Sequence, residues 1–203
     1  MAKVIQVGLG GWGFNWAETI LPTVETADIV GYVDTSEEAL ARIQKELAVP
    51  ASQCFTSLEA AVDAVEADIA LGTLRTAAHF PFAKQALEAG LNVMVEKPFA
   101  STVQEARTLV EIAEFQGKVL AVSQNYRFFP APILASEMLA GKELGPCDLI
   151  SLDFRQHAPS LNYRYWDMPD PLLADMSIHH FDLMRMVVGA EPQRLSWRTW
   201  NPG

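Results

Sequence analysis

Short apolar runs rich in β-branched residues alternate with helical stretches from Lys3 to Ser123. The runs expected to form strands are residues 4–7, 29–33, 69–71, 92–96 and 119–122. Two of the helical stretches open at Ser36 and Ser101, where a serine stands ahead of acidic residues as it does at helix amino ends. This alternation predicts an α/β fold with a doubly wound parallel sheet and right-handed crossovers.

Three glycines, Gly8, Gly10 and Gly13, form a GxGxxG pattern directly after the first expected strand and before a helical stretch. In this context the first glycine allows a tight turn, the second lets the backbone approach a pyrophosphate, and the third permits close packing of helix on strand. Free N–H groups at the helix start attract phosphate. We therefore predict a Rossmann domain that binds NAD(P) at residues 1–122.

Asp34 ends the second expected strand, 21 residues after Gly13. An acid at this place can accept hydrogen bonds from the ribose hydroxyls of an adenosine. The alternative is that Asp34 only caps the turn before Ser36. Because a carboxylate repels a 2′-phosphate, NAD is the expected cofactor and NADP is less favoured.

The composition excludes several classes of partner. The net charge of −10, from 25 acidic and 15 basic residues, repels polyanions, so no nucleic acid is expected. Cys54 and Cys147 lie far apart without disulfide or zinc-site spacing, which favours a reducing, cytoplasmic location. No signal peptide or membrane span is expected. Four residues offer metal ligands but fit no compact motif, so no metal site is predicted: Asp153, His157, Asp167 and Asp175.

The sequence changes in character after Tyr126, where prolines and a Gly-Pro turn appear. We predict a second, incomplete α+β domain at residues 123–203, which serves substrate binding and oligomerisation. Its expected strands are residues 148–156 and 193–199. Because two strands rarely form a stable sheet alone, we expect an exposed apolar patch, with either a homo-oligomer formed through residues 148–203 or disorder of that region.

A helix is expected between these strands, capped by Asp170, with Pro171 in its first turn and Gly189 just past its end. At about 100° per residue, Asp175, His179 and Asp182 fall within about 60° of one another on one face. Such an Asp–His pair can equally be an ordinary solvated pair. The neighbouring His180 faces the apolar side and is expected to be a core histidine.

The segment AGLNVMVEKPFA, with Glu96, Lys97 and Pro98, resembles the EKP signature of the glucose-fructose oxidoreductase, inositol dehydrogenase and rhizopine-catabolism (Gfo/Idh/MocA) family. Three further segments resemble motifs of that family: GLGGWG at 8–13, NYRF at 125–128 and DMSIHHFD at 175–182.

Two places depart from the family pattern. Thr73, Leu74 and Arg75 stand where the family has Thr-Pro before a histidine, here His79. Ser177 replaces a glycine in the last motif.

The resemblance implies an NAD(P)-dependent oxidoreductase that transfers a hydride between the cofactor and a hydroxyl of a sugar, polyol or related compound. By the same resemblance, Lys97 contacts the reacting hydroxyl, Asp175 orients the substrate, and His179 is the general acid/base, a task that suits a pKa near neutrality. The expected cofactor-binding residues are Gly8, Gly10, Gly11, Trp12, Gly13, Asp34, Thr73, Leu74, Glu96 and Lys97.

Other interpretations stay open from the sequence. A non-catalytic nucleotide-binding protein, or a truncated pseudoenzyme that keeps the cofactor pocket, is the main alternative. Tyr126 and Arg127 either line the cleft or pack a domain interface. Trp12 and Trp16 lie on the first expected helix and are more typical of packing or interface residues than of cofactor contacts, although Trp12 lies close enough to the loop to contact a cofactor.

Overall fold

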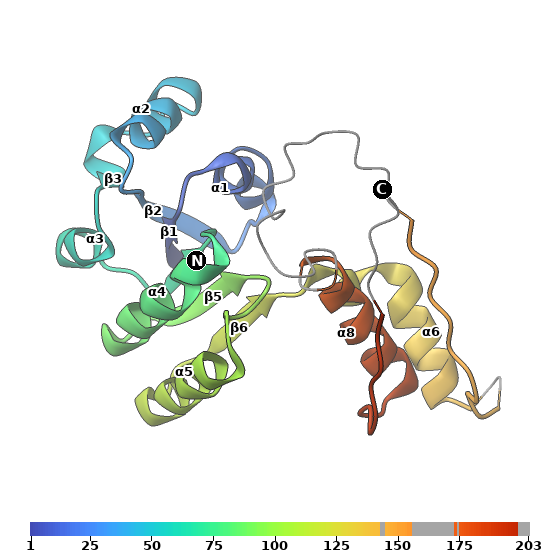
Figure 1. The fold of residues 1–203 in the computed structure, drawn as a ribbon. Helices are drawn as coiled ribbons and strands as arrows, with labels where there is room; N and C mark the ends of the chain where they lie inside the picture. Colours follow the sequence, from blue (N-terminus) through green and yellow to red (C-terminus); the bar gives the residue numbers. More distant parts are fainter. Residues whose placement is uncertain (143–144, 156–172, 174, 199–203) are drawn as a thin grey trace. The chain divides into compact units, whose positions relative to one another are not determined.

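A computed structural model of the chain describes residues 1–142, 145–155, 173 and 175–198 (Figure 1). The chain divides into two compact units, Met1–Ser123 and Gln124–Gly203. Asp170 and Pro171, the predicted helix start, and the candidate ligands His157 and Asp167 lie outside the described residues.

The first unit is built on a six-stranded sheet in the order β3-β2-β1-β4-β5-β6, with every pair parallel. Its strands are β1 (Ala2–Val7), β2 (Ala27–Val33), β3 (Cys54–Phe55), β4 (Ile69–Gly72), β5 (Asn92–Glu96) and β6 (Leu120–Ser123). All five predicted strands are present, and the two-residue edge strand β3 is additional. The order reverses between β1 and β4, and in open α/β sheets ligands bind outside the carboxyl ends of the strands at such a point. The predicted doubly wound Rossmann fold is confirmed.

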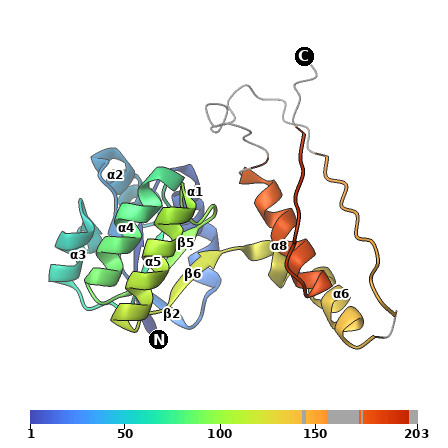
Figure 2. The same cartoon turned by 60° about the horizontal axis from the view of Figure 1, so that its bottom comes forward.

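Helices cover both faces of this sheet. They are α1 (Gly11–Asn15), the π-helical turn η1 (Trp16–Ile20), η2 (Leu21–Thr23), α2 (Glu37–Glu46), η3 (Ala51–Gln53), α3 (Leu58–Ala64), α4 (Thr76–Glu88) and α5 (Val103–Gln116). Helices α3, α4 and α5 bury their apolar sides against one face, whereas α1 and α2 pack on the other. Figures 1 and 2 show α4 and α5 lying side by side.

A buried aliphatic core lies between the sheet and the helices that cover it. Ile5, Leu87, Val95 and Leu109 are fully buried between the sheet and its helices. Each such aliphatic side chain contributes roughly 1.5–3 kcal/mol on burial. The carboxyl edge of the sheet is therefore a rigid support for the loops that follow β1, β2, β4 and β5.

Capping side chains fix the helix starts. Ser36 caps α2 as predicted, because its hydroxyl accepts the N–H of Ala39 at 3.2 Å. The cap of α5 is Thr102 and not the predicted Ser101. Thr102 accepts the N–H of Glu105, while the Glu105 carboxylate accepts the N–H groups of both Ser101 and Thr102. A charged acceptor that binds two amides favours this register.

The second unit contains η4 (Asn125–Phe128), α6 (Pro130–Ala140) and α8 (Ser177–Val188). The hydroxyl of Ser136 on α6 donates to the carbonyl of Met186 on α8 at 3.2 Å. Gly189 ends α8 with φ of +67°, and its N–H bonds to the Arg185 carbonyl, as predicted. The prediction of one uninterrupted helix is wrong at Met176, which forms a turn. There the N–H of His179 donates to the Met176 carbonyl, only three residues back.

The strands predicted at 148–156 and 193–199 are not formed in the described parts of these segments, 148–155 and 193–198. A strand needs a neighbour for its backbone N–H and C=O groups, and neither segment has a ladder partner among the described residues. Their apolar side chains are exposed, including Leu149, Leu195 and Trp197. Within the described chain, no helix combines the length and apolar character needed to cross a membrane.

Candidate functional site

The glycine loop after β1 has no room for a side chain at Gly8 or Gly13, but it has room at Gly10. Gly8 has φ of +95°, and a Cβ there would lie 2.8 Å from the Thr73 carbonyl oxygen. A Cβ on Gly13 would collide with the Gly8 carbonyl oxygen, whereas one on Gly10 would meet nothing within 4 Å. Gly8 and Gly13 are thus required by packing, and Gly10 leaves room for a group that approaches the backbone from outside.

A buried polar layer supports this loop from below. Gln6 is fully buried, and its side-chain N–H groups donate to the Gly13 carbonyl at 2.7 Å and to the Thr73 hydroxyl at 3.1 Å. The Thr73 hydroxyl donates to the Gly8 carbonyl at 2.5 Å. Thr73 therefore holds the loop, and its predicted contact with the cofactor stays a prediction; Gln6 was not predicted. The signal for Gln6 was an amide inside the otherwise apolar strand VIQV.

Asp34 at the end of β2 bridges the glycine loop and the next helix. One carboxylate oxygen accepts the N–H of Leu9 at 2.6 Å and the other accepts the N–H of Ser36 at 2.8 Å. Asp34 thus caps the turn before Ser36 and also ties the loop to β2. A carboxylate has about four lone-pair sites, so these two bonds leave acceptor capacity for ribose hydroxyls.

Glu96 at the end of β5 is buried and binds two tryptophans. One of its oxygens accepts the indole N–H groups of Trp12 and Trp16, both at 2.9 Å, and the other accepts the backbone N–H of Lys97 at 3.1 Å. The first helix is therefore tied across the sheet edge to the EKP segment. The indole partners of Glu96 lie 84 and 80 positions away in sequence, so no local pattern indicated them.

His79 on α4 joins the loop after β4 to the EKP segment. Its ring is fully buried, with Nδ1 2.8 Å from the Pro98 carbonyl oxygen and Nε2 3.1 Å from the Leu74 carbonyl oxygen. The Lys97–Pro98 peptide is cis, and Lys97 is half-buried. The loop that departs from the family pattern, Thr73-Leu74, is therefore anchored to the segment that presents Lys97.

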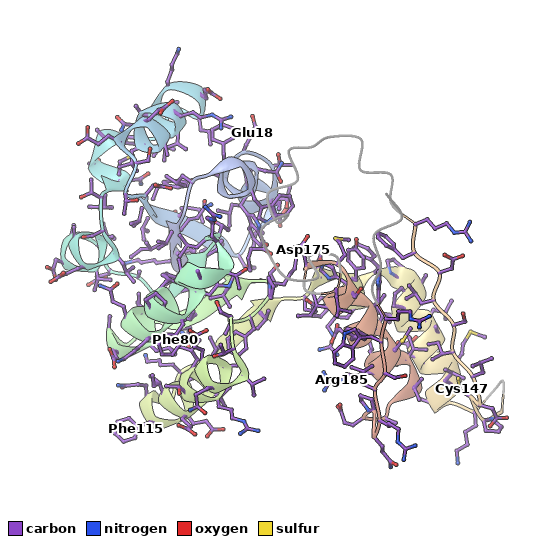
Figure 3. The ribbon with its side chains drawn as sticks, in the orientation of Figure 1. Glu18, Phe80, Phe115, Cys147, Asp175 and Arg185 are labelled. Atoms are coloured by element: carbon purple, nitrogen blue, oxygen red, sulfur yellow. The ribbon has the colours of Figure 1, made fainter. Side chains whose placement is uncertain are left out.

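The second unit gathers the other predicted catalytic residues. Asp175 and His179 are each only 4% exposed, and Asp175 lies beside the start of α8 (Figure 3). The Tyr126 ring stacks on the His179 ring with centroids 4.1 Å apart and planes 13° apart. Arg127 Nε lies 3.2 Å from a carboxylate oxygen of Asp182. The NYRF turn thus packs directly on the face of α8 that carries His179.

His180, predicted as a core histidine, is only partly buried and lines a separate, apolar hollow of the second unit. Its ring centroid lies 4.7 Å from that of Phe154, and it shares a hollow of about 390 Å³ with Met176 and Ser177. Burial lowers the pKa of His180. Ser177, at the position where the family has glycine, accordingly lies on the packing side of the helix.

Lys97 belongs to the first unit, whereas Asp175 and His179 belong to the second. The predicted convergence of the three on one substrate stays a prediction. Among the described residues, no three His, Cys, Asp or Glu side chains gather as a metal site would need.

Comparison with known families and proteins gives consistent matches. The sequence model of a family described as "Oxidoreductase family, NAD-binding Rossmann fold" matches residues 2–124. An uncharacterised protein, y4oX of Sinorhizobium fredii, is 30% identical over 98% of this chain and 57% of its own length. A UDP-N-acetylglucosamine 3-dehydrogenase of Acidithiobacillus ferrooxidans is 29% identical over 82% of this chain and 49% of its own.

Solved structures share the fold. Scyllo-inositol dehydrogenase from Lactobacillus casei, with bound NAD(H) and scyllo-inositol, superposes with a TM-score of 0.75 at 21% identity over 93% of this chain and 56% of that one. GenD2 from gentamicin A biosynthesis, in complex with NAD, gives 0.62 at 30% identity over 70% of this chain and 40% of that one. The chain spans about half the length of the relatives that it matches.

Proposed function

Because this chain belongs to the Gfo/Idh/MocA oxidoreductase family, we propose that it serves hydride transfer between NAD and a hydroxyl-bearing carbon of a sugar, polyol or related compound. The observation that carries the proposal is the geometry of the glycine loop. Gly8 and Gly13 leave no room for a side chain, Gly10 is accessible from outside, and a hydrogen bond joins the loop to Asp34. A relative that acts on a UDP-sugar and a fold neighbour that binds scyllo-inositol support the substrate class.

In this proposal, residues at the carboxyl edge of the sheet would hold NAD. Gly10 and Gly11 receive the pyrophosphate, and Asp34 accepts hydrogen bonds from the adenosine ribose. The negative charge of Asp34 favours NAD over NADP. Bound NAD supplies the hydride acceptor, and Trp12, Leu74, Glu96 and Lys97 flank its nicotinamide end.

The protein's own groups manage the proton and the developing charge. His179 accepts the hydroxyl proton as the hydride leaves carbon, and Lys97 stabilises the developing alkoxide. Asp175 orients the substrate. The burial of Asp175 and His179 supports a built polar site, because charged and polar groups are costly to bury without a specific environment.

Association and location belong to the same proposal. The exposed apolar side chains between 148 and 198 support a homo-oligomer formed through residues 148–203. Cys54 and Cys147, which are both free thiols, fit a reducing cytoplasm.

The test is to incubate the chain with NAD and a panel of inositols, hexoses and UDP-sugars while following absorbance of the reduced cofactor. Lys97→Ala and His179→Ala should each lower turnover by about 100-fold or more while NAD still binds. Lys84→Ala removes the same charge as Lys97→Ala but from the exposed surface of α4, and should leave turnover unchanged. NAD binding without turnover on any substrate would favour the non-catalytic alternative, and absence of NAD binding would refute the cofactor proposal.

A further inference from the structure

Glu96 is a buried carboxylate that accepts three N–H groups, two from indoles and one from the Lys97 backbone. It is 6% exposed. A buried carboxyl group is costly unless its oxygens are hydrogen-bonded, and bonds to a carboxylate are among the stronger ones in proteins. One side chain thereby sets the positions of Trp12, Trp16 and Lys97 together.

The two indoles that bind Glu96 have different surroundings. Trp16 is half-buried and packs against the apolar cluster that contains Val4 and Leu71. Trp12 is 53% exposed although its N–H is held at 2.9 Å. Trp16 both bonds to Glu96 and packs in an apolar cluster, whereas the Trp12 ring bonds to the same carboxylate while more than half of it stays exposed.

The strand order places Trp12 where the second half of a dinucleotide arrives. β1 lies between β2, which is followed by Asp34, and β4, beyond which β5 ends at Glu96. A dinucleotide with its adenosine ribose at Asp34 and its pyrophosphate at Gly10 continues along this edge toward β4 and β5. Trp12, tethered from the glycine loop to the end of β5, lies on that course.

We propose that Trp12 is an aromatic platform for the nicotinamide ring and that Glu96 is the positioning residue that fixes this platform and the Lys97 backbone in one frame. The inference deepens the proposed function and rests on it. An indole face attracts a flat cationic ring by a cation–π interaction. The oxidised nicotinamide is cationic and the reduced one is neutral, so the platform favours NAD⁺ over NADH.

The test is calorimetric titration of NAD⁺ and NADH into the whole chain and its variants. Trp12→Leu should weaken NAD⁺ binding by about tenfold and NADH binding by less. Glu96→Gln should change the affinities for NAD⁺ and NADH in the same direction as Trp12→Leu does. Energy transfer from tryptophan to bound NADH should fall in Trp12→Leu, which gives a readout independent of catalysis.

Two variants serve as controls. Glu18→Gln makes the same charge change at an exposed position on η1 (Figure 3), and Trp197→Leu removes an indole that is 65% exposed in the other unit. Both should bind NAD⁺ and NADH as the wild type does. If Glu96→Gln fails to fold, Trp12→Phe decides instead, because it keeps a ring but loses the N–H that Glu96 accepts, and it should weaken NAD⁺ binding measurably.

The outcomes separate this inference from the proposed function. Wild-type binding with no change in Trp12→Leu overturns the platform. A weakened Trp12→Leu together with unchanged Glu96→Gln, or unchanged Trp12→Phe, overturns the positioning role of Glu96. A wild-type chain that binds neither NAD⁺ nor NADH overturns the proposed function itself, and this inference with it.

Discussion

The ring of Tyr126 lies nearly parallel to the imidazole of His179, with 4.1 Å between centroids. Tyr126 also stacks on Phe129, with centroids 5.1 Å apart, so its own ring is held by the turn from which it comes. Aromatic pairs of this kind contribute about 0.5–1.5 kcal/mol beyond the area they bury. The stack therefore restrains the orientation of the imidazole to which we assign proton transfer.

Replacing Tyr126 tests that restraint. Tyr126→Leu should lower turnover by about 2- to 10-fold, the equivalent of one ring stack, while Tyr126→Phe should stay close to wild type because it keeps the ring. Steady-state kinetics on the active protein would measure both. Phe128→Leu, at an exposed position in the same turn, is the control. Equal losses in Phe128→Leu and Tyr126→Leu would assign the effect to the turn as a whole.

The choice of cofactor should respond to the charge of Asp34. Asp34→Asn keeps an oxygen acceptor for a backbone N–H but removes the charge that opposes a 2′-phosphate. The preference for NAD over NADP should shrink by about tenfold or more, since like charges a few ångströms apart repel by more than 1 kcal/mol near a protein surface. Calorimetric titration with both cofactors measures the ratio. Asp28→Asn, near the opposite end of β2, should leave the ratio unchanged, and an equal shift there would contradict the local argument.

The fold of the first unit could be predicted because its strands, helices and glycine loop show a local sequence periodicity. Alternating strands and helices, the GxGxxG loop and the Ser36 cap each depend on residues a few positions apart. The two-residue strand β3 is too short to show a period. It forms because its residues pair with Tyr32 and Val33 of β2. The strands expected after residue 148 show the alternating pattern but do not form, because the described residues offer no neighbouring strand for them to pair with.

The supporting contacts of the candidate site could not be read from the sequence in the same way. Glu96 and Trp12 meet only because β1 and β5 are brought to one edge of the sheet, and Gln6 reaches Gly13 through the core. The bond between Glu96 and Trp12 follows from topology and not from spacing. The sequence identified the residue types that bear chemistry, but not the side chains that hold them.

The stability of the second unit should depend on pH through His180. Burial lowers the pKa of His180 below its ordinary value of 6.5, so the folded state favours the neutral ring. The unfolded chain then binds more protons in this range, and stability is full above about pH 6.5 and falls as the pH drops below it. Thermal melts of wild type and His180→Phe, which suits the hollow beside Phe154, should diverge with pH. An equally steep loss in both proteins would show that other groups cause it.

The glycines of the loop should separate into structural and functional positions. A methyl group on Gly13 collides with the Gly8 carbonyl, which the Thr73 hydroxyl holds in place, so Gly13→Ala must displace the loop. We expect it to lower the free energy of unfolding by roughly 1–3 kcal/mol even without cofactor.

A methyl group on Gly10 meets nothing within 4 Å, so Gly10→Ala should change stability by no more than about 0.5 kcal/mol. The same methyl group stands where the pyrophosphate must approach the backbone, and NAD should bind at least about tenfold more weakly. Thermal denaturation of the cofactor-free proteins and calorimetric titration with NAD distinguish the two effects. Wild-type affinity in Gly10→Ala would show that the pyrophosphate does not lie over Gly10, and a wild-type melting temperature in Gly13→Ala would show that the loop can open without cost.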